Sequence, residues 1–423
     1  MPGKLTSSAS RTAWILVALL FPVALLNYLD RQMLASMKGS VMGSLSDIQL
    51  EANWGFMLGS FKWVYAVFSP LGGYLADKVS RKRVIIFSLV AWSLVTWTTG
   101  HVGTYGELLV TRAAMGISEA FYIPAALALI ADYHTGATRS RAIGVHQIGI
   151  YAGVIVGSFS GYVADSHSLG WRWAFDACGL AGLLYALPLL RLLRDAPRAP
   201  GEAPRPAISV RSATRDLLGN RDFLFLVLYF TLPAIAGWVV RDWMPAILRD
   251  ELGLKQGPAG VSATVWWQGA AIVSALIGGW LADRWMRRSL RGRIWASAVG
   301  MGFIIPALLG IGVALAQHSL WLAVVFLVLY GLGWGLFDCN NMPILCQITR
   351  PELRATGYGI MNFVSINIGG FADLGFGAMR DAKVPLTAIF GLIAAAATVS
   401  LVLVLLIRPR DPLALAASPT TLP

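Results

Sequence analysis

Long, uninterrupted apolar runs are the feature that most constrains how this chain can fold, and Leu386–Ile407 shows it most clearly. Runs of about 20 apolar residues are long enough to cross a bilayer as an α-helix. In lipid, only helices and closed barrels satisfy every backbone hydrogen bond, and a barrel requires short strands of alternating polarity that these runs lack. Only 13% of the 423 residues are charged, against roughly 25% in a soluble globular chain. The sequence therefore predicts an all-α membrane protein.

The apolar runs predict about twelve transmembrane helices. We expect them near residues 13–37, 55–77, 82–101, 105–131, 141–165, 171–193, 221–249, 259–283, 293–316, 319–345, 355–380 and 385–407. The long connection between the sixth and seventh spans is rich in Pro, Ala and charge, which is typical of a linker. We therefore expect a six-helix bundle over 1–193, a cytoplasmic linker over 194–220, a second six-helix bundle over 221–410 and a cytoplasmic tail over 411–423.

The basic residues are unevenly distributed among the connections. Most of the 34 Lys and Arg residues fall on the side that holds both termini, including the clusters 81–83 and 287–288. The positive-inside rule then places both termini in the cytoplasm of a multi-pass protein of the inner (plasma) membrane. The same distribution explains the net charge of +12 without a nucleic-acid partner.

Two parts of the chain repeat each other. The second predicted span ends with Gly-Tyr-Leu-Ala-Asp-Lys at 73–78, and the eighth ends with Gly-Trp-Leu-Ala-Asp-Arg at 279–284. An acid followed five residues later by a proline also recurs, as Glu119 and Pro124 and as Asp338 and Pro343. Duplicated halves of this kind are typical of transporters built from two parallel repeats.

The segment from Gly72 to Arg83 resembles the signature loop of the major facilitator superfamily, and the repeated segment at 279–288 resembles it too. Residues 112–116 (Arg-Ala-Ala-Met-Gly) resemble the span-four motif of the same superfamily. The resemblance covers essentially the whole chain and implies two pseudo-symmetric six-helix bundles. It also implies gating residues at the ends of spans two and eight, namely Asp77, Arg81 and Asp283. The two acids would approach the positive N-termini of helices in the opposite half and latch the halves together.

Two acids and two arginines fall inside the predicted spans: Asp30 and Arg31 on the first, Arg112 and Glu119 on the fourth. A charge at bilayer depth costs at least about 2.5–3.5 kcal/mol on insertion scales, so each requires a reason. Arg112 and Glu119 are two helical turns apart and share one face, so we expect all four to converge on one cavity. Because an acid beside an arginine stays ionised and a desolvated acid favours its protonated form, such a cluster suits a proton-coupled carrier. The plainer interpretation is that Asp30–Arg31 and Arg112–Glu119 are ion pairs that hold helices together.

This cluster, together with Tyr65 on the second span, resembles the constellation of the anion:cation symporter family, which includes bacterial sugar-acid/proton symporters. The resemblance implies that Asp30 and Glu119 carry protons and that Arg31 or Arg112 receives the substrate carboxylate.

Further polar residues lie within the spans. Lys62 is either an additional anion contact or a side chain that reaches the outer interface. Gln147, Asn341 and Asn362 carry amides, which suit the hydroxyls of a polyol and suit hydrogen bonds between helices equally well.

Glycines recur every four residues on the fifth predicted span, at Gly149, Gly153, Gly157 and Gly161. Small residues at this spacing allow two helices to pack closely, so this face is predicted to lie against another helix. Drug/proton antiporters of the superfamily have a Gly-Pro step in this span. Here Ser158 follows Gly157, which argues against an exporter of that type.

We therefore predict a monomeric secondary transporter, not an enzyme, that takes up a small organic anion such as a hexonate or hexuronate by alternating access. The proton gradient would drive it, without a cofactor or metal. One alternative is a spinster-type lysolipid transporter, which shares the Asn-Tyr-x-Asp-Arg motif at 27–31 and a span-four Glu, and which requires an apolar cavity rather than polar walls. Others are a neutral sugar/proton symporter and, in a different class, a membrane enzyme or sensor.

Overall fold

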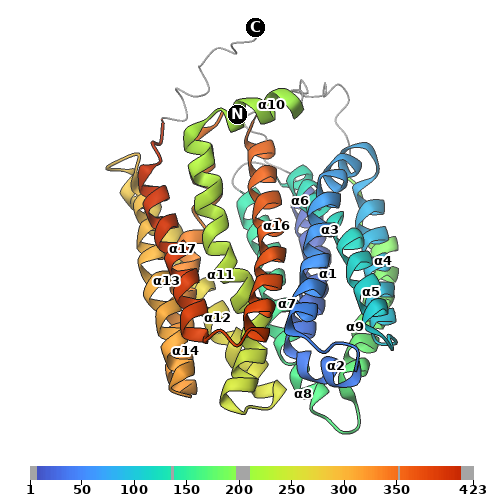
Figure 1. The fold of residues 1–423 in the computed structure, drawn as a ribbon. Coiled ribbons are helices and arrows are strands. Elements are labelled where there is room, and N and C mark those ends of the chain that lie inside the picture. Colours follow the sequence, from blue (N-terminus) through green and yellow to red (C-terminus); the bar gives the residue numbers. More distant parts are fainter. Residues whose placement is uncertain (1–6, 135–137, 197–209, 351–352, 411–423) are drawn as a thin grey trace. The chain divides into compact units, whose positions relative to one another are not determined.

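The computed structural model describes residues 7–134, 138–196, 210–350 and 353–410, and the regular structure in these ranges is α-helical, as predicted (Figure 1). The chain divides into two compact units. Unit 1 comprises residues 1–202, 241–249 and 254–264, and unit 2 comprises 203–240, 250–253 and 265–423.

The first part of the chain forms nine helices in its described residues. They are α1 (Ser7–Ser36), α2 (Lys38–Ser44), α3 (Glu51–Lys78), α4 (Arg81–Thr99), α5 (Tyr105–Ala120), α6 (Tyr122–Tyr133), α7 (Arg139–Ser158), α8 (Ser160–Ala164) and α9 (Gly170–Leu192). The remainder forms α10 (Val210–Leu218), α11 (Arg221–Leu252), α12 (Gln256–Met286), α13 (Gly292–Ala316), α14 (Leu320–Asp338), α15 (Asn341–Ile348), α16 (Arg354–Asp381) and α17 (Leu386–Leu406). Helix α10 lies in the region predicted to be a linker.

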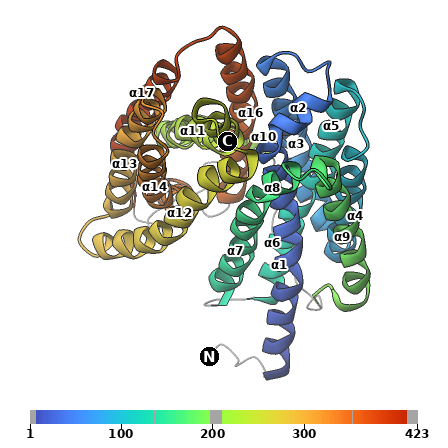
Figure 2. The ribbon, with the colours of Figure 1, turned by 90° about the horizontal axis from the view of Figure 1, so that it is seen from below.

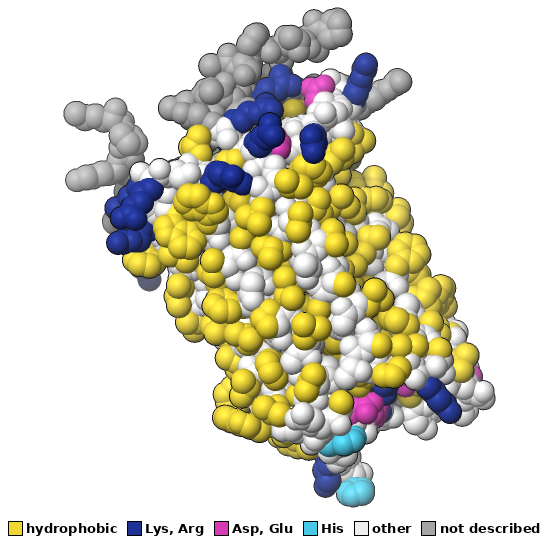
Figure 3. All heavy atoms as spheres, turned by 60° about the vertical axis from the view of Figure 1, so that its left-hand side comes forward, with side chains coloured by type: hydrophobic (Ala, Val, Ile, Leu, Met, Phe, Trp, Pro, Cys, Tyr) yellow, Lys and Arg dark blue, Asp and Glu magenta, His cyan; other side chains and the backbone are white. Residues whose placement is uncertain are grey.

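Within the described ranges, nine helical stretches are long and apolar enough to cross a membrane. The other three predicted spans correspond to α3, α4 and α16. These helices carry polar or basic residues, such as Lys62 in α3 and Asn362 in α16, which lower their hydropathy. On the face drawn in Figure 3, hydrophobic side chains cover the middle, and charged side chains gather at both ends.

The predicted fourth and tenth spans are each interrupted by a break. Helix α5 ends at Ala120 and α6 begins at Tyr122, while α14 ends at Asp338 and α15 begins at Asn341. Proline removes one backbone donor and clashes with the carbonyl four residues earlier. For Pro124 that carbonyl belongs to Ala120, and for Pro343 it belongs to Cys339. The two repeated prolines therefore explain why these spans are not continuous helices.

Local signals fix where α5 begins. The Thr104 hydroxyl accepts a hydrogen bond from the Glu107 backbone N–H at 3.2 Å, and the Glu107 carboxylate accepts one from the Gly103 N–H at 2.7 Å. This reciprocal arrangement closely resembles a capping box. It sets the register of the helix that carries Arg112 and Glu119.

Glycines of α7 lie against α1, which confirms the predicted close helix contact (Figure 2). A methyl group added to Gly149 or Gly157 would come within 2.9 or 2.6 Å of the carbonyl oxygen of Phe21 or Leu29, respectively. A methyl group at Gly153 would overlap the intervening carbonyl of α1. We call these three contacts the glycine seam. The fourth glycine of the series, Gly161, lies outside the seam.

Candidate functional site

The four intramembrane charges of α1 and α5 pair crosswise between the two helices. Arg31 Nη2 lies 2.5 Å from Glu119 Oε2, and Arg31 Nε donates to the same oxygen at 2.6 Å. Arg112 Nη1 lies 3.6 Å from Asp30 Oδ1. The pairs within one helix that the sequence suggested are therefore wrong. Neighbouring residues on a helix point in directions about 100° apart, and residues two turns apart are separated by about 10 Å along the axis.

These charges are almost completely withdrawn from solvent. Asp30 and Glu119 are 0% exposed and Arg112 is 2% exposed, whereas the Arg31 side chain retains 15% exposure. Glu119 also interacts electrostatically with Asp30 and Arg112, so the two pairs form one network. Because an unpaired buried charge is strongly destabilising, each acid depends on its arginine. Arg31 is the member of the network with the most access to solvent.

Helix α4 supports the Arg112–Asp30 pair with hydroxyl groups that were not among the predicted site residues. Thr96 Oγ1 donates to Asp30 Oδ2, and Arg112 Nη2 donates to Thr99 Oγ1 at 3.4 Å. Thr96 and Thr99, three residues apart on one helical face, were the available signal.

Aromatic rings surround the Arg31 guanidinium. Its central carbon lies 4.7 Å from the ring centroids of Tyr28 and Phe61, and 5.1 Å from that of Tyr65. Such contacts stabilise a cation through the electron density of the ring face. Tyr65 is thus brought to the cluster as predicted, while Phe61, one turn before it on α3, and Tyr28 are additional members.

Several buried polar atoms of this cluster have no hydrogen-bond partner among the described residues. They are Asn27 Nδ2 and Oδ1, Asp30 Oδ1, Arg112 Nε and Glu119 Oε1. Buried polar groups in folded proteins are nearly always hydrogen-bonded. A group of donors and acceptors left open together is therefore suited to polar atoms of a ligand or to water.

Lys62 of α3 lies in a further buried ion pair of unit 1. Its Nζ is 2.6 Å from Oδ2 of Asp242 on α11, and its side chain is only 4% exposed. One of the two interpretations placed the Lys62 ammonium group at the outer interface. The buried ion pair excludes that interpretation in this structure. Its partner could not be inferred from the sequence, because the two residues lie far apart in the chain.

The predicted amide contacts are dispersed. Gln147 is half-buried on α7, next to His146, whose Nε2 lies 2.9 Å from the hydroxyl of Tyr122. Asn341 and Asn362 belong to unit 2, where Asn341 is buried and Asn362 is half-buried. Both amide atoms of Asn341 lack hydrogen-bond partners among the described residues.

The predicted gating residues are engaged within their own units. Arg81 donates to the Ala128 carbonyl at 2.8 Å and forms an ion pair with Asp132 on α6. Asp283 is largely exposed and lies 3.3 Å from Arg293 Nη2. The side chain of Asp77 lies outside the described part of the chain.

Comparison with known proteins supports the family suggested by the sequence. Residues 20–372 match the model of the Major Facilitator Superfamily. The chain is 28% identical to an MFS-type efflux pump of Mycolicibacterium smegmatis over 88% of this chain and 85% of that protein. It is 27% identical to Protein spinster homolog 1 of Xenopus laevis over 86% of this chain and 72% of the relative.

Solved structures share the fold. A bacterial homologue of the human lysosomal transporter Spinster, in an inward-facing and unoccupied conformation, matches with a TM-score of 0.74 at 20% identity over 94% of this chain and 95% of that one. A D-xylose–proton symporter matches with a TM-score of 0.78 at 15% identity over 94% of this chain and 98% of that one. Together with the family match over most of the sequence, these results show that the chain is a multi-pass membrane transporter, not an enzyme, and belongs to the major facilitator superfamily.

Proposed function

We propose that this transporter moves an anionic amphiphile of the lysolipid class and couples that movement to protons. The observation that supports this best is the crossed, buried pairing of Arg31 with Glu119 and of Arg112 with Asp30. We further propose that Asp30 and Glu119 carry the protons and that Arg31 receives the anionic group of the substrate.

The proton and the anion compete through Arg31. While Glu119 is ionised, its Oε2 atom is paired with both Nη2 and Nε of Arg31, so the guanidinium is not available to another anion. Protonation removes the negative charge and frees the guanidinium for another anion. The incoming anion then restores the charge that the proton removed, so the buried site keeps its net charge throughout. Arg31 suits this role better than Arg112 because its side chain is 15% exposed, against 3% for Arg112.

The surroundings of Arg31 favour an amphiphile over a polyol acid. Three aromatic rings lie within 5.1 Å of its guanidinium carbon. These rings offer apolar surface to the part of an amphiphile that lies next to its anionic group. The relatives named spinster also favour the lysolipid alternative over the anion:cation symporters. Uptake of a hexonate or hexuronate, the leading prediction from the sequence, remains an outcome that the experiment below distinguishes.

We also propose that both termini face the cytoplasm of the plasma membrane. The basic residues of the connections lie mostly on the terminal side of the predicted topology, and the positive-inside rule supports that orientation.

The test is transport by the purified protein in liposomes with an imposed pH gradient. Labelled lysophosphatidylglycerol and labelled glucuronate are offered separately. We expect gradient-driven movement of the lysolipid, its loss in Glu119→Gln, and retained substrate exchange in that variant. Glu107→Gln is the matched control, because it makes the same change at an exposed position of the same helix, and glutamine can still accept the capping hydrogen bond from Gly103.

Each result decides one part of the proposal. Movement of glucuronate alone would overturn the substrate class and leave the coupling mechanism standing. Gradient-driven accumulation in Glu119→Gln equal to that of the unmodified protein would overturn the role of Glu119. Arg31→Gln should weaken the apparent affinity for the lysolipid by about tenfold or more, since a charge-assisted contact is lost.

A further inference from the structure

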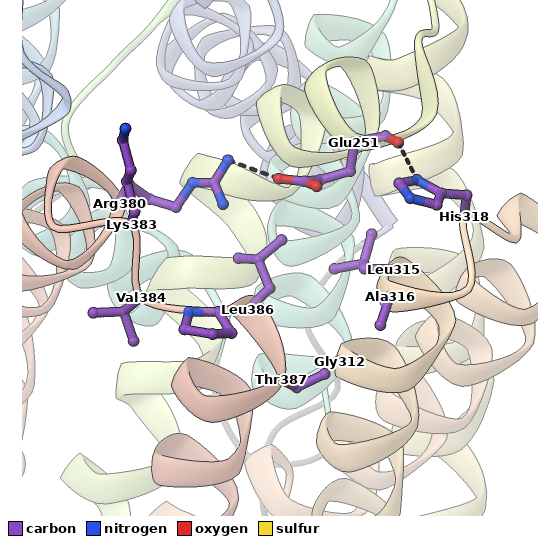
Figure 4. Close-up of a pocket in the computed structure, with 11 residues that line it drawn as sticks. Glu251, Gly312, Leu315, Ala316, His318, Arg380, Lys383, Val384, Leu386 and Thr387 are labelled. Carbon is purple, nitrogen blue, oxygen red and sulfur yellow. Dashed lines mark hydrogen bonds and ion pairs between the residues drawn. The ribbon is translucent and has the colours of Figure 1, made fainter.

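Unit 2 contains a cavity of about 370 Å³ where the ends of four helices meet (Figure 4). The C-terminal ends of α11, α13 and α16 contribute Glu251, Ala316 and Arg380, and the start of α17 contributes Thr387. All of these residues belong to unit 2, and none belongs to the charge cluster of α1 and α5.

The cavity carries opposite charges on different walls. Arg380 and Lys383 lie on one side and Glu251 on the other (Figure 4). Arg380 Nη2 is 2.7 Å from Glu251 Oε1, and both side chains are about one quarter exposed, at 25% and 27%. The pair is therefore accessible to a ligand. It is also too exposed to be worth much as a purely structural ion pair.

Helix ends reinforce this separation of charge. The start of the 21-residue α17 presents the positive end of its dipole beside Thr387, and anions favour such a position. The C-termini of α11, α13 and α16 present negative ends, which favour a cation. Because Glu251 and these helix C-termini are negative, a ligand with only negative charge suits the cavity poorly.

The rim of the cavity is held in an uncommon backbone conformation. Among the described residues other than glycine, positive φ angles occur at His318 (49°) and Lys383 (56°), and both line this cavity. His318 Nδ1 also lies 2.8 Å from the backbone carbonyl of Glu251. Both residues follow the end of a helix, where the Ser319 N–H donates to the Ala314 carbonyl and the Val384 N–H donates to the Met379 carbonyl, each at 3.0 Å, so their left-handed conformation belongs to helix C-caps.

Apolar surface leads away from the charged groups. Leu315 and Leu386 line the cavity between the charged walls and its base (Figure 4). On the outer face of α13, Leu309 and Val313 are 49% and 48% exposed, and exposed Ala316 continues the same helical stripe into the cavity. The acyl chain of a bilayer lipid can lie along such a stripe, because α13 is apolar enough to span the membrane.

From these features we infer that the cavity binds the headgroup of a zwitterionic phospholipid. The phosphate contacts Arg380 and Lys383, the ammonium group contacts Glu251, and an acyl chain lies along α13. The shared chemistry is phosphoethanolamine, and its source is a bilayer lipid such as phosphatidylethanolamine. This site is separate from the proposed transport site and does not depend on it.

The test is lipid binding to the purified, delipidated protein, measured by native mass spectrometry with palmitoyl-oleoyl phosphatidylethanolamine or phosphatidylglycerol. We expect Arg380→Gln and Lys383→Gln each to weaken phosphatidylethanolamine binding by about tenfold. Glu251→Gln should weaken phosphatidylethanolamine binding and leave phosphatidylglycerol binding unchanged or stronger. Arg350→Gln removes a cation from another ion pair of unit 2, with Asp216, and should have no effect.

Lys383→Gln is informative even if Arg380→Gln fails to fold, because Lys383 is exposed. Equal binding of both lipids, with Glu251→Gln strengthening both, would reveal a simple anion site and overturn the zwitterion assignment. Binding of free phosphoethanolamine as tight as that of the lipid would overturn the lipid source. Phosphatidylethanolamine binding that none of the three cavity variants alters would overturn the proposal that the lipid binds in this cavity.

Discussion

The crossed pairing of α1 with α5 predicts a specific pattern of energetic coupling. Arg31→Gln, Glu119→Gln and the double variant form one double-mutant cycle, and Arg112→Gln, Asp30→Asn and their double variant form a second. A third cycle, between Arg112 and Glu119, tests the pair that shares one helix. Since a cycle isolates the interaction between two side chains, the three coupling energies rank the pairs directly.

The expected magnitudes follow from burial and contact distance. Removing one partner of a buried pair costs about 3–5 kcal/mol, because the other charge loses its counter-ion. Glu119→Gln should fall near the lower end, about 3 kcal/mol, since three aromatic rings still contact Arg31. We expect a coupling of about 2–3 kcal/mol for Arg31 with Glu119 and less for Arg112 with Asp30, whose closest contact is 3.6 Å. The Arg112–Glu119 cycle should give less than about 1 kcal/mol.

Reversible unfolding in mixed micelles, followed by tryptophan fluorescence, supplies the free energies of unfolding. A coupling between Arg112 and Glu119 equal to or greater than that between Arg31 and Glu119 would refute the crossed arrangement. The exposed Glu107→Gln variant should leave the unfolding free energy within about 0.5 kcal/mol of the unmodified protein and so controls for the change of residue type.

Three further predictions concern the contacts around this cluster. Gly153→Ala should lower the unfolding free energy by about 1–3 kcal/mol because its methyl group would overlap a carbonyl of α1, whereas Gly144→Ala, which faces open space on the same helix, should change it by less than about 1 kcal/mol. Lys62→Met should destabilise the protein by about 3 kcal/mol, because Asp242 is left as an unpaired buried charge, and adding Asp242→Leu should recover most of that loss in the same assay. A Lys62→Met variant as stable as the unmodified protein would show that the pair contributes nothing. Thr96→Val should reduce gradient-driven accumulation about fivefold, because Asp30 loses a hydrogen bond; unchanged accumulation would show that the hydroxyl has no part in coupling.

The elements of the fold were predictable because their signals are local. Apolar length marked the spans, and the repeated Asp and Pro positions marked the duplication. The choice of Asp30, Arg31, Arg112 and Glu119 as one cluster also followed from sequence, because a charge in a membrane span needs a reason to be there.

What the sequence could not supply was the identity of partners. Helical periodicity places Arg112 and Glu119 on one face, but it does not say which arginine of α1 or α5 meets which acid. The pairing of Lys62 with Asp242 depends on how distant segments pack, and no local pattern encodes it. The helix break after Ala120 could have been predicted from the sequence, because a proline such as Pro124 generally clashes with the carbonyl four residues earlier. The lipid-specific chemistry of the cavity in unit 2 depends on helix ends that are separated in the chain and meet only in the folded protein.

The glycine seam has a mechanical consequence. Its contacts step by four residues on both helices, with positions 149, 153 and 157 facing the carbonyls of 21, 25 and 29. A slide by one residue would shift α1 by about 1.5 Å and drive bulky neighbours into the space that the glycines leave. We therefore expect α1 and α7 to move together as one body during a transport cycle. A displacement of Asp30 on α1 would then also move α7, the helix that carries His146 and Gln147.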